Sequence, residues 1–518
     1  MTLAGDVATA DGASAQLRMK GPMDDSVAID RASDVSSAVA SSATPPQAKV
    51  GAAQTTIYGL GAIVDATTSV FLNTYLYFYL TAVCGMEGWM AGLALALPLA
   101  LDAMVDPLVG SLSDNLQSRF GRRRPFMLAA ILPIGVSLGL LFSVPVGLTG
   151  WGLFAYVIGL ALALRVGLSL FNLPYAALGA ELTSDYVARS TLASARFAIS
   201  TAGNLVGLTL GYGVFLSAKA GGQLHRAGYT PLAWSGAALI MGMGLVSALG
   251  TRMKGLPAPP PGSGWSRESL LREFREVLRN QTFLILSLTL VVFMAAEGAA
   301  LALTLHVSTF FWRLTPGEIL ITAIAPIPAA LVGAALTASL NRRLEKRTIA
   351  QIGLGLLFVS QCAPVVLVLS GALPAKAILP VLIVAAFLLG AAATMIIVGV
   401  SSMMADATDE HELLYGGRRE ALFFAGTSFA GKASNGLGLL LAGLITYGVR
   451  FPSHPGAPGS PGAPSWASVR DLALITGPGV ALSLAIPFLM LLGYRINRAR
   501  HAEILRTLAV RKAAAPSA

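Results

Sequence analysis

Long apolar segments recur along the whole chain, separated by short stretches rich in glycine, proline or charge. Each segment covers about 20 residues or more, the length that a helix needs to cross about 30 Å of hydrocarbon. Of the 518 residues, 55% are hydrophobic and only 12% are charged, whereas about a quarter of the residues in a soluble protein are charged. The pattern predicts an all-α polytopic membrane protein. We expect twelve spans, at 56–83, 89–112, 125–146, 151–177, 193–217, 231–252, 281–306, 317–340, 349–371, 376–400, 421–448 and 471–494.

The basic residues gather on alternate loops. The formal net charge is +10, and Arg122–Arg124 lie between spans 2 and 3, whereas the next loop, VPVGLTG, carries no Lys or Arg. Positive loops remain on the cytoplasmic side. The charge therefore predicts topology rather than a nucleic-acid partner. We expect a multi-pass protein of a bacterial-type inner (cytoplasmic) membrane, with both termini cytoplasmic.

Six spans, a long inner loop and six more spans are the layout of transporters built from two related bundles, which bind substrate near the bilayer midplane. Such a chain can function as a monomer. Cys84 and Cys362 are expected to be packing thiols, and no metal centre or cofactor is predicted. The predicted regions are a disordered tail (1–55), a first six-helix bundle (56–253), a linker with an amphipathic helix (254–280), a second bundle (281–496) and a basic C-terminal tail (497–518).

Two carboxylates interrupt the second span. Asp102 and Asp106 are four residues apart, so they share one helix face. A charge at a helix centre costs about 2.5–3.5 kcal/mol on insertion scales and usually marks an ion or substrate pathway. Two neighbouring carboxylates can share a proton or hold a small cation. The pair therefore predicts a cation site.

Other ionisable residues within the spans are candidates for the same machinery. Lys432 is the expected counter-charge, needed when the cation leaves. Arg165 shares a face with Asn172, and it either contacts substrate or pairs with Asp65, Asp102 or Asp106; Arg196 has the same alternatives. The roles of Glu297, a candidate proton site, and of His306 are left open.

The loop after the second span reads G-x-L-x-D…G-R-R-R, with Asp114 and Arg122, Arg123 and Arg124. The glycines permit close helix approach and a tight turn. We expect these charges to form a cytoplasmic network that opens when the protein changes state.

This loop resembles the signature of the major facilitator superfamily. Together, YGLGAIVD (58–65), DAMVDPLVGSLSDNLQSRFGRRRPF (102–126), NLPYAALGAELTSDYVARSTLASARF (172–197) and MMADATDEHELLYGGRREALFFAGTSFAGKASNGLG (403–438) resemble the glycoside–pentoside–hexuronide:cation symporter family, whose best-known type is the melibiose permease. The resemblance implies that Asp102, Asp106 and the Ser169 hydroxyl bind Na⁺, Li⁺ or H⁺. It also implies that Lys432 serves coupling and that Arg196 lies near the sugar.

The chain departs from the melibiose permease in the sugar pocket. Asn172 stands in the place of an aspartate and Ala176 in the place of a tryptophan. Asp65 stands in the place of a lysine, and Ala66 in the place of the sugar-binding aspartate. The coupling residues are thus kept while a galactoside pocket is altered, and a neutral neighbour at the cation site slightly favours H⁺ over Na⁺. The predicted substrate-binding residues are Asp65, Arg165, Asn172, Tyr175 and Arg196.

The sequence predicts an alternating-access symporter, not an enzyme, that imports a sugar or glycoside with H⁺ or Na⁺. One alternative keeps the fold and carries a lysolipid, steroid or other amphiphile. Another is a non-transporting membrane sensor or assembly factor. No metal cluster, nucleophile triad or phosphate-binding loop stands out in the sequence to indicate catalysis.

Overall fold

A computed structural model of the chain describes residues 51–514 except 117, 119–120, 184, 252–278 and 417–419. Gly51–Ala518 is one compact unit, and its described elements are helices. Most of the predicted N-terminal tail and nearly all of the predicted linker helix at 254–280 lie outside the described residues. The boundaries proposed for the two bundles remain predictions.

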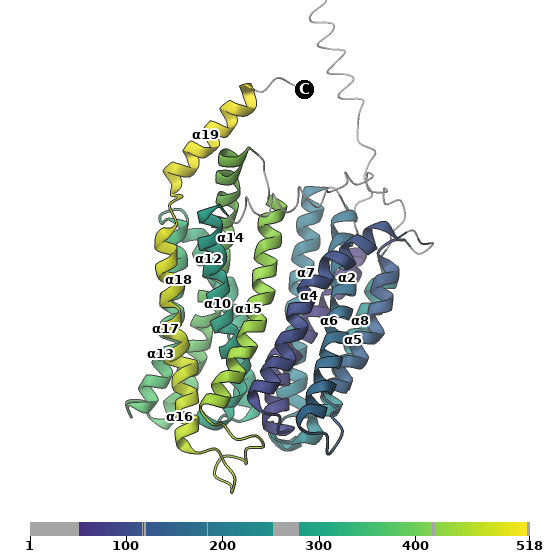
Figure 1. The fold of residues 1–518 in the computed structure, drawn as a ribbon, viewed down its shortest axis with the longest axis vertical. Helices are drawn as coiled ribbons and strands as arrows, with labels where there is room; N and C mark the ends of the chain where they lie inside the picture. Colours follow the sequence, from purple (N-terminus) through teal and green to yellow (C-terminus); the bar gives the residue numbers. More distant parts are fainter. Residues whose placement is uncertain are drawn as a thin grey trace, which may run out of the picture. The chain divides into compact units, whose positions relative to one another are not determined.

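The first six spans are built largely from long helices (Figure 1). Span 1 combines α2 (Ala52–Leu60) and α3 (Ala62–Val70) with two π-helical turns, η1 (Phe71–Leu76) and η2 (Tyr79–Val83). The other five are α4 (Gly88–Asn115), α5 (Arg124–Leu141), α6 (Gly150–Glu181), α7 (Tyr186–Leu208) continued by the π-helical η3 (Thr209–Phe215), and α8 (Tyr229–Gly250).

The last six spans begin after the undescribed segment 252–278. They are α10 (Gln281–His306) with the π-helical η6 (Val307–Phe311), α11 (Pro316–Ile324) with α12 (Pro326–Leu340), α13 (Lys346–Leu369), α14 (Ile378–Tyr415), α15 (Glu420–Gly448), and α16 (Trp466–Leu474) with η8 (Ile475–Gly479), α17 (Val480–Ser483) and α18 (Ala485–Met490).

Local sequence explains several of these boundaries. The Asp185 side chain accepts a hydrogen bond from the Ala188 amide and begins α7, as an N-cap residue should. Thr315 and Glu318 form a capping box at the start of α11. Gly416 ends α14 at φ 78°, a left-handed conformation that glycine adopts without strain.

Helices occupy all twelve predicted spans. Eleven stretches of the described residues are long and apolar enough to cross a membrane, and α15, with 29 residues, occupies the remaining predicted span. The predicted all-α, twelve-helix fold is therefore confirmed. Two helices exceed their predictions by seven residues or more: α7 begins seven residues earlier, and α14 continues fifteen residues further, through ADATDEHELLY.

α4 and α15 pack against each other along the middle of the molecule and join the two halves of the chain. Their contact depends on glycine. A Cβ atom at Gly92 would lie 2.6 Å from the Leu439 carbonyl oxygen, and one at Gly443 would lie 2.6 Å from the Gly88 carbonyl oxygen. Since both obstacles are backbone atoms, neither can move aside without separating the helices.

We expect Gly443→Leu to force α4 and α15 apart and to reduce transport more than tenfold, because overpacking a close crossing costs about 1–3 kcal/mol or more. Gly355→Leu is the matched control, since a Cβ atom at Gly355 in α13 meets nothing within 4 Å. Initial uptake rates, corrected for the amount of protein in the membrane, measure the effect. Equal rates in the two variants would contradict the importance of the crossing.

The two halves are also tied together at the end of the bundle away from α19. Tyr77 and Thr446 share a hydrogen bond of 2.8 Å between their hydroxyl oxygens, and Gln223 donates to Thr309 over 3.2 Å. Thr81 and His306 form a third link. We call this set of contacts the sealed end, and it lies toward the bottom of Figure 1.

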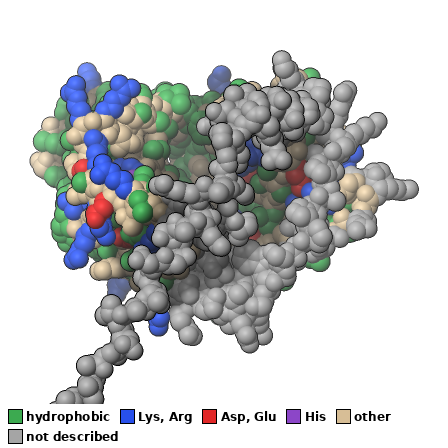
Figure 2. Space-filling model, turned by 90° about the horizontal axis from the view of Figure 1, so that it is seen from above, with side chains coloured by type: hydrophobic (Ala, Val, Ile, Leu, Met, Phe, Trp, Pro, Cys, Tyr) green, Lys and Arg blue, Asp and Glu red, His purple; other side chains and the backbone are tan. Residues whose placement is uncertain are grey.

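The opposite end carries the basic loops and α19 (Arg498–Ala514). Figure 2 views the molecule from this end and shows Lys and Arg side chains gathered on the side of α19. The sequence predicted only a basic tail here. α19 nevertheless packs on the second half, because Ile504 and Leu508 are buried with Met404 and Ala407 of α14. We call it the basic end.

Candidate functional site

The paired aspartates lie against a lysine from the other half of the chain. Asp102 is 4% exposed, and Lys432 Nζ of α15 lies 2.8 Å from its Oδ2. The same Nζ also contacts Asp106 Oδ2. The i, i+4 spacing puts both carboxylates on one face of α4, and Lys432, 330 residues later in the chain, bridges them.

Ser169 of α6 closes the other side of the pair. Its Oγ lies 2.5 Å from Asp102 Oδ1 and 2.7 Å from Asp106 Oδ1. A hydroxyl has a single proton to donate, so it can donate to only one of these carboxylates. A proton on one carboxyl group would satisfy the second short contact by donating to the Ser169 oxygen. The geometry therefore accommodates one proton shared by Asp102, Ser169 and Asp106.

A second polar group joins α3 to α6. Asn172 Nδ2 donates to Asp65 Oδ1 over 2.8 Å, and the Asp65 side chain is exposed. Arg165, two turns before Asn172 on α6, experiences the charges of Asp102 and Asp65. Arg165 thus interacts electrostatically with both the predicted cation site and the predicted substrate residue Asp65.

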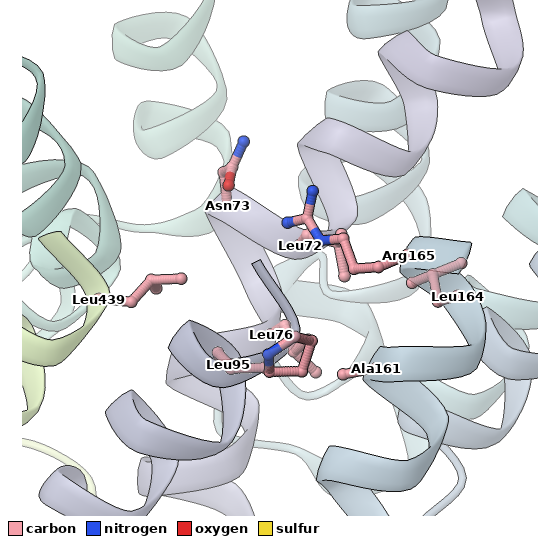
Figure 3. Close-up of a pocket in the computed structure, with 9 residues that line it drawn as sticks. Leu72, Asn73, Leu76, Leu95, Ala161, Leu164, Arg165 and Leu439 are labelled. Atoms are coloured by element: carbon pink, nitrogen blue, oxygen red, sulfur yellow. The ribbon is translucent and has the colours of Figure 1, made fainter. Parts of the chain in front are cut away.

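A small cavity adjoins Arg165. It has a volume of about 20 Å³, which is room for about one water molecule. Asn73 and Arg165 supply the polar groups of its wall, and Leu439 of α15 lines it from the other half (Figure 3). A sugar does not fit this space. Sequence reasoning did not select Asn73. This residue lies in the π-helical turn η1, and such turns are frequent at functional sites.

Tyr175 and Arg196 lie together, away from the cavity lining. Tyr175 is 3% exposed, and its ring stacks on Tyr58 with centroids 4.7 Å apart. The guanidinium of Arg196 lies 5.5 Å from the Tyr175 ring centroid, a cation–π arrangement. In this state Tyr175 packs α6 against α2, and substrate contact by these two residues remains a prediction.

The described contacts of the predicted gate arginines join parts of the first half of the chain. Arg122 Nη2 lies 2.7 Å and Arg123 Nη2 3.1 Å from Glu181 Oε1, and Arg123 also donates to Ser113 over 2.8 Å. Arg124 donates to the backbone carbonyl of Thr251. These contacts bind the α4–α5 loop to the ends of α6 and α8.

Sequence reasoning did not select Glu181 or Ser113 as partners of these arginines. Glu181 lies in GAELTSD, part of a family-like motif, whereas Ser113 had no comparable signal. Asp114 lies in the last turn of α4, and its side chain is outside the described part of the chain. A further charged cluster was also missed at the basic end of the second half. There Lys346 Nζ lies 2.7 Å from Asp406 Oδ2, and His501 Nε2 of α19 lies 3.1 Å from Asp409 Oδ2.

Glu181→Gln should destabilise the protein by about 1–3 kcal/mol, because it removes the charge from a partly buried group that serves two arginines. Glu503→Gln is the control, since Glu503 is 65% exposed in its pair with Arg500, and an exposed pair is worth about 0–1 kcal/mol. Thermal unfolding in detergent compares the two. A loss no greater for Glu181→Gln than for Glu503→Gln would contradict a role for this network.

The two residues whose roles were left open have definite places. Glu297 Oε1 accepts a hydrogen bond from Gln361 Nε2 of α13 over 3.1 Å, inside the second half of the chain. His306 lies in the sealed end, fully buried. Neither contacts the Asp102–Lys432 site.

These features define a membrane transporter with its polar site between two groups of helices. Residues 57–498 match the family model described as "MFS/sugar transport protein". The chain belongs to this family, the glycoside–pentoside–hexuronide:cation symporters of the major facilitator superfamily. The protein is therefore a transporter rather than an enzyme, and the family resemblance found in the sequence is confirmed.

Similar proteins agree with this placement. The chain is 27% identical over 409 residues to the inner membrane symporter YicJ of Escherichia coli, covering 76% of this chain and 82% of that protein. It is 24% identical over 393 residues to the isoprimeverose transporter of Lactiplantibacillus pentosus, covering 75% and 78%. A bacterial homologue of the lysosomal transporter Spinster, solved inward-facing and unoccupied, has a TM-score of 0.59 at 14% identity, covering 88% and 100%; it supports the fold alone.

Proposed function

We propose that the protein couples inward movement of H⁺ to uptake of a sugar or glycoside. The observation that carries the choice of H⁺ is the geometry at Ser169, where two carboxylates contact one hydroxyl and a shared proton satisfies both contacts. Lys432 Nζ lies between the same carboxylates and contacts an oxygen of each. A Na⁺ bound there would need those oxygens as ligands, and the ammonium group already occupies them.

The charges of the site also favour a single proton. Asp65, Asp102 and Asp106 supply three negative charges, and Arg165 and Lys432 supply two positive ones. One bound proton makes this group neutral, and loss of the proton leaves one net negative charge. Because uncompensated charge is costly within a membrane, the neutral, loaded form is the one suited to reorientation with substrate.

Transport would then follow from the relative movement of the two halves. The basic end faces the cytoplasm in this proposal, because positive loops stay on that side. The sealed end is closed toward the outside, and the 20 Å³ cavity is a collapsed substrate site. Opening the sealed end would let a sugar reach Asp65, Asn73, Arg165 and Asn172 from the outer side. Its hydroxyl groups suit amide, carboxylate and guanidinium partners.

The cargo is proposed to be a sugar or glycoside, since the family description names sugar transport and one relative is named for isoprimeverose. The test is uptake into proteoliposomes of a panel of labelled mono- and disaccharides, isoprimeverose included, under an imposed pH or Na⁺ gradient. At one proton per sugar, an inward gradient of about two pH units drives at most about 100-fold accumulation, because each unit is tenfold.

Accumulation of one sugar under the pH gradient, but not the Na⁺ gradient, is the expected result. Accumulation that follows Na⁺ would overturn the choice of ion. Failure to accumulate any sugar, by protein that is correctly inserted, would overturn the choice of cargo, and lysolipids and steroids would form the next panel.

A further inference from the structure

His306 is a buried titratable side chain that the proposed transport site does not use. It is the last residue of α10, 0% exposed, and its Nε2 lies 2.9 Å from Thr81 Oγ1 of η2. The ring is enclosed by aromatic side chains, with centroids 4.8 Å from Phe78, 5.6 Å from Tyr77 and 5.5 Å from Phe451. One imidazole thus links span 1, span 7 and the segment after α15.

The hydrogen bonds around Thr81 determine where the imidazole proton lies. The Thr81 hydroxyl donates to the Tyr77 carbonyl oxygen over 2.8 Å, which uses its single proton. Its oxygen therefore accepts from His306, and Nε2 carries the hydrogen. The other nitrogen, Nδ1, is buried and has no partner among the described residues. In a neutral ring, Nδ1 is the unprotonated nitrogen.

A second proton on this ring would have no acceptor in the closed seal. Tyr77 is the titratable side chain that contacts it, and its hydroxyl bonds to Thr446. The charged and titratable groups on the neighbouring segments make other contacts: the carboxylate of Glu87 accepts from Trp89, Arg450 is the residue before Phe451, and His454 lies against Gly85. No described carboxylate is bonded to His306, and a buried charge without a partner is strongly unfavourable.

We propose that His306 is a proton-sensitive latch, and that the sealed end closes only when its imidazole is neutral. When the seal opens, the ring is exposed to water and is able to bind a proton. When the seal closes, the proton must leave, because the aromatic enclosure offers Nδ1 no acceptor. This device is separate from the Asp102–Asp106 site and does not depend on the identity of the cargo.

The direction of the pH dependence follows from this assignment. An imidazole in water titrates near pH 6.5. Above that pH the open form is already neutral, and closure is unimpeded. Below it the open form gains a proton that the closed form lacks, so the closed-to-open ratio falls by about tenfold for each further pH unit. Acid on the outer side therefore holds the seal open.

The reporter for the test is Thr446→Cys, a nearly isosteric change at a residue that is 4% exposed in the closed seal. It is placed in a background with Cys84→Ala and Cys362→Ala, the chain's only natural cysteines. A membrane-impermeant maleimide labels proteoliposomes between pH 5 and pH 7.5. Each rate is divided by the rate for the same protein unfolded in detergent, which removes the pH dependence of the thiol itself.

We expect the normalised rate to rise about tenfold per pH unit below about pH 6.5 when His306 is present. His306→Gln should give a flat profile, since an amide keeps a donor for Thr81 but does not titrate. His454→Gln and His225→Gln, which change the two other described histidines at this end, should each retain the rise. A flat profile in the reporter protein that keeps His306 overturns the latch whatever the His306→Gln variant does, and an unchanged rise in His306→Gln overturns it also.

Discussion

Asp106→Asn is expected to abolish gradient-driven accumulation while leaving exchange of substrate across the membrane intact. The asparagine is neutral, as the protonated aspartate is, and its amide can donate to the Ser169 oxygen 2.7 Å from the present carboxylate. The variant is thus fixed in the charge state proposed for reorientation. Because it cannot release a proton, an imposed gradient has nothing to act on.

Under a gradient of about two pH units, accumulation should fall from as much as about 100-fold in the wild-type protein to equilibration. Counterflow, in which unlabelled sugar inside drives entry of labelled sugar, should continue. Asp409→Asn is a useful control, since Asp409 is a carboxylate of α14 at the basic end that pairs with His501. Accumulation by Asp106→Asn at the wild-type level would contradict the proposed coupling.

Lys432→Ala should be the most destabilising single change at the site. It removes the ammonium group that bridges both carboxylates, of which Asp102 has a side chain only 6% exposed. Breaking a buried pair from one side costs about 3–5 kcal/mol, and the lower end applies because Lys432 is 28% exposed. Lys376→Ala, at an exposed lysine in the turn Ala375–Ala377, should have almost no effect.

The cause of this loss is testable with a second substitution. If uncompensated negative charge is responsible, adding Asp106→Asn to Lys432→Ala should restore stability, with a coupling energy of about 1–3 kcal/mol between the two sites. Thermal unfolding of the two single variants and the double variant measures it. Additive losses would show that Lys432 acts through packing of α15 and not through its charge.

Much of the fold was predictable because a bilayer restricts what a chain can do. Apolar segments of about 20 residues have to form helices there, so the twelve spans could be located before their packing was known. The break at η1 in span 1 could not, since FLNTYL contains neither proline nor glycine. The break at η8 in span 12 does have a local signal in Gly477, Pro478 and Gly479. α19 was not predicted because only two of its residues, Ile504 and Leu508, belong to the buried cluster. The segment around them is strongly basic, so its apolar face is narrow.

The site was predictable to the extent that its residues are costly. Asp102, Asp106 and Lys432 stand out because charges in a span are rare, and the structure brings them together although their roles remain predictions. Asn73 and Ser113 are uncharged and common, so the sequence alone offers no reason to select them. Tyr175 was selected because it lies in a motif that resembles the family. The motif does not reveal that its ring stacks on Tyr58.

The most direct test of proton coupling is to measure proton movement itself. Sugar from the uptake panel is added to proteoliposomes in a lightly buffered medium without any imposed gradient. The account predicts that the external medium becomes alkaline as sugar enters, by about one proton per sugar, and that Asp106→Asn shows no such change. Sugar entry through the wild-type protein without alkalinisation, accompanied instead by uptake of Na⁺, would contradict it.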